Sequence, residues 1–243
     1  MKVLIFLLFT TLLFADSYPQ FSQNNLKNIE QHSGYIAKNR VLDYIRTINS
    51  FKKYNKALQL TKVNLYLNQL LPKYDNVLQK QKNYWATPKE FLITGYGDCE
   101  DYAIIKYFTL LKLGFDEKKL YLTVVDEKFK CRSHEVVEGE YICSHHMVLS
   151  YFKTKNKAPL ILDNLSFRVL NLKQRKDLTA DTFTNSTGIY RMDKKYKLNK
   201  VANYAEEFEN LLKKIKIEQQ LTSRSHNEND IHNNIFSYNF IKL

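Results

Sequence analysis

Apolar side chains in the first half of the chain recur every three or four residues, which is the period of an α-helix. This pattern predicts helices across residues 22–83. The Thr87-Pro88 pair marks a boundary before another helical turn and a loop that ends at Gly97. The helix that follows is the best defined of all, because Asp98 can cap its start and Gly114 can end it.

Beyond residue 119 the pattern changes to that of β-strands. Runs of β-branched and aromatic residues, bounded by charged or turn residues, predict neighbouring antiparallel strands. Helices followed by strands indicate an α+β fold, in which the long helix packs against an antiparallel sheet. The strand candidates are residues 120–125, 146–152 and 159–162, with shorter ones near 169–170 and 188–190.

The two ends of the chain differ in composition from its centre. Residues 1–15 carry Lys2 near their start, continue apolar for about a dozen residues and end at Ala15. This pattern is typical of a secretory signal peptide, and the apolar run is too short to span a bilayer. Residues 16–221 then form one domain that closes on a charged helix over 201–221. Residues 222–243 are interpreted as a flexible polar tail. We therefore expect an exported protein that does not span a membrane once mature.

Composition excludes several classes of function. The 243 residues include six glycines and three cysteines, and they contain no Gly-rich nucleotide loop, Gly-x-Ser-x-Gly elbow, His-Glu-x-x-His motif or Cys-x-x-Cys pair. The formal net charge of +12 would suit nucleic acid, but the basic residues are scattered and lack interleaved aromatics. A solvated basic surface is the preferred interpretation, without a nucleic-acid partner. Contact with an acidic partner or a membrane surface stays open.

A cysteine opens the best-defined helix. Cys99 lies in its first turn, where unpaired amides and the helix dipole favour a thiolate. His146 starts one predicted strand and Asp163 closes the next, so antiparallel pairing would bring the two together. Asp163 could then orient the imidazole that takes the proton from Cys99. The spacing leaves an alternative open, namely a buried structural cysteine beside a strand-end histidine and an ordinary turn aspartate.

Five motifs in a fixed order carry a resemblance to a known family. The chain resembles the bacterial transglutaminase-like cysteine proteinases, which are periplasmic proteases that cut large biofilm adhesins from the cell surface. The likeness covers about residues 25–192. The motifs are Trp85-Ala-Thr-Pro-Lys-Glu90, Gly97-Asp-Cys-Glu-Asp-Tyr102, Lys106-Tyr-Phe108, His146-Met-Val-Leu149 and Leu162-Asp-Asn-Leu165.

The resemblance implies a papain-like, transglutaminase-type core with cysteine endopeptidase activity. It implies Cys99 as the nucleophile, His146 as the base, with His145 as its rival, and Asp163 as the orienting carboxylate. It also implies two partners: a large surface adhesin, cut in its N-terminal region at small residues, and an inner-membrane receptor that responds to cyclic di-GMP and restrains the protease. Acyl transfer to an amine, as in true transglutaminases, and a non-catalytic adaptor on this fold are the alternatives.

Three carboxylates, those of Asp98, Glu100 and Asp101, surround Cys99 in the sequence. Their repulsion should raise the pKa of the thiol and oppose the thiolate. A hard cation bound by these oxygens would remove the repulsion, and the resemblance implies that this cation is Ca²⁺. Asp98 and Glu100 match the family's metal-site positions. The alternative is that Asp98 and Asp101 form a capping pair at the helix start.

The two remaining cysteines and the single tryptophan lead to further expectations. Cys131 and Cys143 lie in a long polar connection, and in an oxidising compartment such a pair predicts a disulfide that leaves Cys99 as the free thiol. Trp85 either lines the active-site groove or packs in the core.

Overall fold

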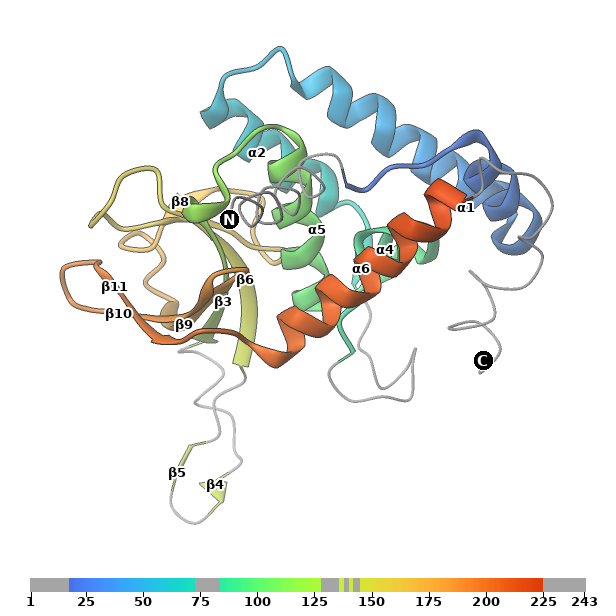
Figure 1. Cartoon of the computed structure of the whole chain (residues 1–243). Helices are drawn as coiled ribbons and strands as arrows, with labels where there is room; N and C mark the ends of the chain where they lie inside the picture. Colours follow the sequence, from blue (N-terminus) through green and yellow to red (C-terminus); the bar gives the residue numbers. More distant parts are fainter. Residues whose placement is uncertain (1–17, 73–83, 128–135, 138–139, 142–144, 225–243) are drawn as a thin grey trace, which may run out of the picture.

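The computed structural model describes residues 18–72, 84–127, 136–137, 140–141 and 145–224. A group of helices packs against a seven-stranded sheet, and α5 lies between the sheet and the other helices (Figure 1). This arrangement confirms the α+β prediction. The helices are α1 (Gln23–Phe51), α2 (Lys56–Leu67), α4 (Pro88–Thr94), α5 (Cys99–Lys112) and α6 (Glu206–Arg224), with a short 3-10 turn, η2 (Glu117–Lys119).

The sheet is antiparallel throughout and runs in the order β11-β10-β9-β3-β6-β7-β8. Two further pairs are small: β1 (Leu71–Pro72) pairs with β2 (Tyr96–Gly97), and β4 (Val136–Val137) pairs with β5 (Glu140–Tyr141). The strands of the large sheet are β3 (Leu120–Glu127), β6 (His145–Tyr151), β7 (Leu160–Leu162), β8 (Leu170–Asn171), β9 (Leu178–Asn185), β10 (Gly188–Met192) and β11 (Leu198–Ala202).

Helix α5 is the centre of the core. Every residue from Asp101 to Leu111 is buried, because the sheet covers one side of the helix and other helices cover the rest. A helix that is buried all round is fixed in position by its neighbours. Gly114 follows its C-terminal end with a φ of +75°, as the sequence predicted. The fold therefore holds the start of α5, and with it Cys99, in a rigid setting.

The strand prediction is confirmed for β3, β6 and β7, which are neighbours in the sheet. It missed β9 and β11. Strand β9 carries several Thr and Asn side chains, so its apolar alternation is weak, and pairing with β3 and β10 places it in the sheet. The expected helix over 201–221 was wrong at its start, because Val201 and Ala202 end β11 and α6 begins at Glu206.

The helical prediction over residues 22–83 holds for α1 and α2 but is wrong at residues 71–72. Asn68 caps the end of α2, and Pro72 lacks the N–H that a continuing helix needs. Leu71–Pro72 instead pairs in parallel with Tyr96–Gly97, a stretch that was expected to be loop.

The turn after α4 leads the chain to the start of α5. Gly95 ends α4 with a φ of +80°, and a Cβ at this position would lie 2.2 Å from Cζ of Arg40. Arg40 is that close because its Nη1 donates hydrogen bonds to the carbonyl oxygens of Leu92 (3.1 Å) and Ile93 (2.7 Å). A glycine is therefore required where an arginine from α1 caps α4.

Helix α6 lies along the outside of the helical group (Figure 1) and holds segments from distant parts of the chain. Its Glu218 accepts hydrogen bonds from the Tyr18 hydroxyl and from Thr87 Oγ1, the latter at 2.6 Å. Lys214 donates to the carbonyl oxygen of Trp85. Burial raises the pKa of Glu218 to about 7, so these contacts are made by a carboxyl group that is hard to ionise.

Several expectations lie outside the described residues. They are the signal peptide at residues 1–15, the helix expected over residues 73–83, the disulfide between Cys131 and Cys143, and the tail from residue 225 onward. Residues 222–224 of the expected tail belong to α6. In the described ranges, no helix combines the length and apolar character needed to cross a membrane.

Candidate active site

The candidate nucleophile stands at the helix–sheet junction. Cys99 is the first residue of α5, is partly buried, and its Sγ lies 3.1 Å from Oε2 of Glu100. The backbone N–H of Met147, in β6, donates a hydrogen bond to the sulfur. The start of α5 and the start of β6 therefore meet at Cys99, next to His146.

The surroundings of Cys99 oppose its ionisation. Burial is the largest effect raising the pKa of the thiol, followed by the charge of Glu100 and then a smaller contribution from Asp98. The N–H of Met147 favours the thiolate but does not offset them, so the pKa stays well above its ordinary value. The sequence suggested that the start of the helix would favour a thiolate. In the structure, the helix start alone does not produce one.

His146 and Asp163 meet as the strand pairing predicted. Nε2 of His146 lies 2.8 Å from Oδ1 of Asp163, and the side chains are 6% and 0% exposed. His145 points the opposite way: its side chain is 77% exposed and its Nδ1 lies 3.0 Å from Oδ1 of Asp126. Because neighbouring residues of a strand face opposite sides, His146 alone of this pair can serve the site. Its role as the base stays a prediction.

The environment of Asp163 fixes the proton on His146. Burial would raise the pKa of Asp163, but hydrogen bonds from His146, the backbone N–H of Leu165 and Arg175 hold it well below its usual range. An ionised carboxylate only accepts hydrogen bonds, so Nε2 of His146 must be the donor. Nδ1 is then the basic nitrogen, which is the arrangement needed to take a proton from a thiol.

Two asparagines hold the loop that carries Asp163. Nδ2 of Asn68 donates to the carbonyl oxygens of Asp163 (2.8 Å) and Ser166 (3.1 Å), and Nδ2 of Asn64 donates to that of Ser166 (2.7 Å). The sequence analysis assigned these residues no role. Both lie in the region of family likeness, and their spacing of four residues at the end of α2, which places both on one helix face, was a further signal.

Asp101 acts in the structure as a helix cap. Its Oδ1 accepts a hydrogen bond from the N–H of Ala86 at 2.8 Å, and its Oδ2 accepts one from the N–H of Asp98 at 3.3 Å. Trp85, next to Ala86, is partly buried against the main core. The capping alternative thus describes Asp101 well, while its assignment as a metal ligand stays a prediction.

The family model for bacterial transglutaminase-like cysteine proteinases matches residues 44–178, more than half of the 243-residue chain. The chain belongs to this family. The region of the match contains Cys99, His146 and Asp163, and a cysteine protease of α+β fold agrees with the geometry above. No curated protein sequence matches the chain.

Solved structures of LapG from Legionella pneumophila are similar to this proteinase. The calcium-bound form is 29% identical, with a TM-score of 0.62 over 78% of this chain and 98% of LapG. The EGTA-treated form is 29% identical, with a TM-score of 0.62 over 78% of this chain and 97% of LapG. A third LapG structure is 30% identical, with a TM-score of 0.61 over 81% of this chain and 97% of LapG.

The acidic residues around Cys99 have the chemistry of a calcium site, but they supply only part of one. Carboxylate oxygens suit a hard cation, and both Glu100 and Asp98 raise the pKa of the thiol, a penalty that a bound cation would relieve. Within the described ranges, no three His, Cys, Asp or Glu side chains converge as a ligand group. A cation held by Asp98 and Glu100 would therefore need main-chain oxygens or water as further ligands.

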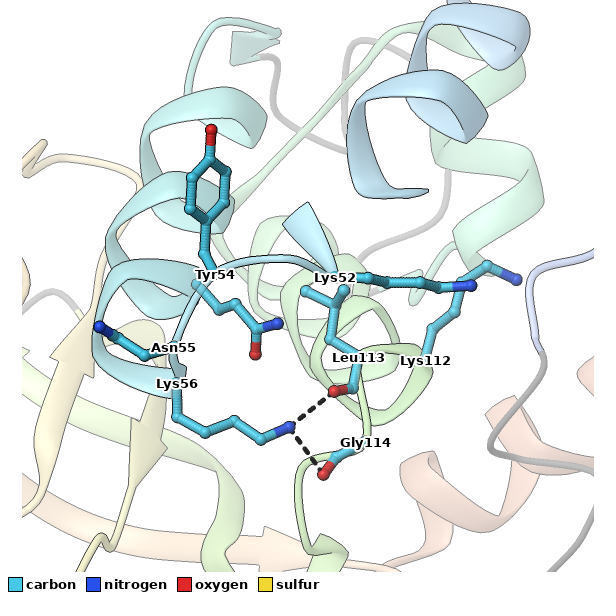
Figure 2. Close-up of a pocket in the computed structure, with 8 residues that line it drawn as sticks. Lys52, Tyr54, Asn55, Lys56, Lys112, Leu113 and Gly114 are labelled. Carbon is cyan, nitrogen blue, oxygen red and sulfur yellow. Dashed lines mark hydrogen bonds between the residues drawn. The ribbon is translucent and has the colours of Figure 1, made fainter. Parts of the chain in front are cut away.

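A cavity of about 440 Å³ lies at the opposite end of α5. Lys112, on its wall, follows Cys99 by 13 residues, or roughly 20 Å along a helix. Figure 2 shows Lys56 reaching the carbonyl oxygens of Leu113 and Gly114, at 2.6 and 2.9 Å. These contacts cap the C-terminal end of α5, so the cavity belongs to the packing of the helices and is separate from the candidate site.

Proposed function

We propose that this proteinase is an exported, periplasmic cysteine endopeptidase that cuts the N-terminal region of a large surface adhesin and so controls adhesion and biofilm release. Cys99 is its nucleophile, His146 its base and Asp163 the carboxylate that orients the imidazole. The observation that carries this proposal is the buried contact between His146 and Asp163, which leaves Nδ1 as the basic nitrogen beside the strand residue that touches Cys99.

The reaction follows from these positions. Nδ1 of His146 takes the proton of the Cys99 thiol, and the thiolate attacks the carbonyl carbon of the scissile peptide bond. Backbone N–H groups near the start of α5 are placed to stabilise the resulting oxyanion. His146 then protonates the leaving amine, and the acyl group stays on Cys99 as a thioester. A water molecule, deprotonated by His146, hydrolyses that thioester and restores the free thiol.

Calcium is part of this proposal. When bound to Asp98 and Glu100, the cation supplies positive charge that offsets the carboxylates raising the pKa of Cys99. The thiolate would then form at a lower pH. The calcium-bound LapG structure supports this idea by similarity.

The remaining partners are proposed from the family resemblance. The substrate is a large adhesin, which is cut where small residues allow an extended chain to reach Cys99. The inhibitor is an inner-membrane receptor that responds to cyclic di-GMP and binds the protease in the periplasm.

The experiment is mass spectrometry of adhesin shed by cells that carry the wild-type protein or Cys99→Ala, with His145→Ala as the matched control. We expect one new N-terminus on the adhesin in the wild type and in His145→Ala, and none in Cys99→Ala. Release by Cys99→Ala at the wild-type rate would refute the proposal. A product joined to an added primary amine, with little hydrolysis, would instead indicate acyl transfer.

A further inference from the structure

Arg175 joins the candidate triad to a second carboxylate. Its Nη2 donates to Oδ2 of Asp163 at 2.8 Å and to Oδ2 of Asp177 at 2.6 Å. Its Nε lies 2.9 and 3.1 Å from the two oxygens of Asp177. The Arg175 side chain is 9% exposed and that of Asp163 is fully buried, so water does not replace the contact between them, whereas the Asp177 side chain is 38% exposed.

The position of Arg175 does not depend on Asp163. Arg175 lies in the turn between β8 and β9, where its N–H donates to the Asn171 carbonyl oxygen (3.3 Å) and its own carbonyl oxygen accepts from the N–H of Leu178 (3.2 Å). The fork to Asp177 then fixes the plane of the guanidinium. Asp163 therefore binds to a cation that the turn has already oriented.

Asp163 keeps enough negative charge to act on the imidazole. Three groups face its carboxylate, namely His146 in β6, Arg175 in the turn and Lys106 in α5. Arg175 makes one contact with Asp163 and three with Asp177, which also lower the pKa of Asp177. Since Asp177 offsets much of the guanidinium charge, Asp163 keeps negative charge with which to stabilise an imidazolium.

We propose that Arg175 is a positioning residue for the triad, with Asp177 as its counter-ion. By holding Oδ2 of Asp163, Arg175 turns Oδ1 toward Nε2 of His146 and keeps the neutral imidazole in the tautomer that is protonated on Nε2. The expected effect of Arg175 on the cleavage rate rests on the proposed function. Its expected effect on the His146 tautomer does not. The competing explanation is that Arg175 only stabilises the fold.

The test is ¹⁵N NMR of the histidine rings in the calcium-supplemented full-length mature protein, recorded over a pH series. The variants are Arg175→Met, Arg175→Lys and Asp177→Asn, and a His146→Gln spectrum assigns the signals. The control is Arg191→Met, because Arg191 makes an exposed pair with Asp181 at 3.0 Å on the same sheet. His145 serves as an internal reference in every sample.

We expect neutral His146 to be the Nε2–H tautomer in the wild type and in Arg191→Met, and a mixture of tautomers in Arg175→Met. In parallel, kcat per titrated active site should fall about 10- to 100-fold with KM within about twofold. Arg175→Lys, which keeps the charge but not the fork, should recover part of the loss. Asp177→Asn should retain the tautomer and lose about fivefold in kcat.

Three other results would overturn the proposal, and a fourth would overturn only the proposed function. An unchanged tautomer with a lower melting temperature would make Arg175 a purely structural residue. If Arg175→Met raises the pKa of His146 and leaves the tautomer unchanged, the charge of Arg175 acts only by opposing the imidazolium. If Arg175→Met does not fold, a wild-type tautomer and wild-type kcat in Arg175→Lys decide against it. Wild-type protein with the expected tautomer but no peptidase activity would refute the proposed function and leave the positioning role intact.

Discussion

The two halves of the candidate site balance their charges differently. In the sheet half, the buried carboxylate of Asp163 is matched by His146, Arg175 and a backbone N–H. In the helix half, the thiol of Cys99 lies against the carboxylate of Glu100 and near that of Asp98, and both raise its pKa. The sheet half therefore favours its working charge state, whereas the helix half opposes it.

This difference separates assembly of the site from its activation. The proposed base and its orienting carboxylate are held in place by contacts that the fold itself supplies. The proposed nucleophile is placed by the fold but left in the wrong protonation state. A cation on Asp98 and Glu100 would change that state without moving the sheet half, so calcium could control activity while the architecture stays the same.

The largest expected effect comes from removing the proposed base in the sheet half. His146→Ala should lower kcat/KM about 1,000-fold, because the proposed general base of the reaction is lost. His145→Ala is the matched control and should stay within about twofold, since His145 is exposed and pairs with Asp126. The measurement is steady-state cleavage of an adhesin fragment. The reverse ranking of the two variants would assign the base to the wrong histidine.

The next effect comes from the helix half. Glu100→Gln removes a negative charge beside the thiol, so without calcium the pH profile of Cys99 alkylation should move to lower pH. With calcium present, cleavage should fall about 100-fold because a ligand is lost. Glu207→Gln, at an exposed position on α6, is the control. If the wild-type protein cleaves at its full rate in EGTA, Asp98 and Glu100 do not act as calcium ligands. The charge contrast between the two halves would then be unrelated to calcium.

Lys106 links the halves, because it lies on α5 and faces Asp163 while its Nζ has no hydrogen-bond partner among the described residues. Burial lowers its pKa to about 7. Between about pH 7 and the ordinary pKa of 10.5, Lys106 is protonated in the unfolded chain but not in the folded protein. The unfolding free energy therefore rises with pH over this range. Lys106→Met should remove this slope and add about 2 kcal/mol to the unfolding free energy at pH 6.

Urea unfolding at pH 6 and pH 9 measures that change. The gain from Lys106→Met should be larger at pH 6 than at pH 9. A variant that is less stable than the wild type at both pH values would show that Lys106 is charged in the folded protein and stabilises Asp163 as an ion pair.

The smallest effect concerns Asp101, which the structure uses as a cap. Asp101→Ala removes the acceptor for two backbone N–H groups and should cost about 1 kcal/mol of stability. The start of α5 would loosen, so activity should fall. The fall should be smaller than in Glu100→Gln, because no proposed calcium ligand is lost. Calorimetric titration with calcium distinguishes the roles: an affinity close to that of the wild type supports the cap, and a loss as large as in Glu100→Gln would make Asp101 a ligand.

The sequence was most informative where structure is local. Helix α5 follows from its apolar spacing and its terminal residues, and the meeting of His146 with Asp163 follows from two strands adjacent in the chain. Both depend on residues close in sequence or on one strand pairing. The family motifs added the reason to place chemistry there.

The parts that were missed depend on contacts between distant residues. Strand β9 contains three threonines and an asparagine in eight residues, and its place between β3 and β10 is decided by pairing rather than by its own pattern. Arg175 and Asp177 lie in a stretch that shares the family likeness, but the sequence analysis assigned them no role. Their relation to Asp163 depends on how that turn is oriented, which no local pattern reports.

The contacts of α6 have a consequence for how the molecule opens. A terminal helix ordinarily frays first, on its own. Here Glu218 holds Tyr18, near the other end of the described chain, together with Thr87 at the start of α4. Opening of α6 or of the segment at Tyr18 removes a hydrogen-bond partner from the other and uncovers the buried face of α6. We therefore expect these two segments and the start of α4 to exchange as one cooperative unit rather than three independent ones.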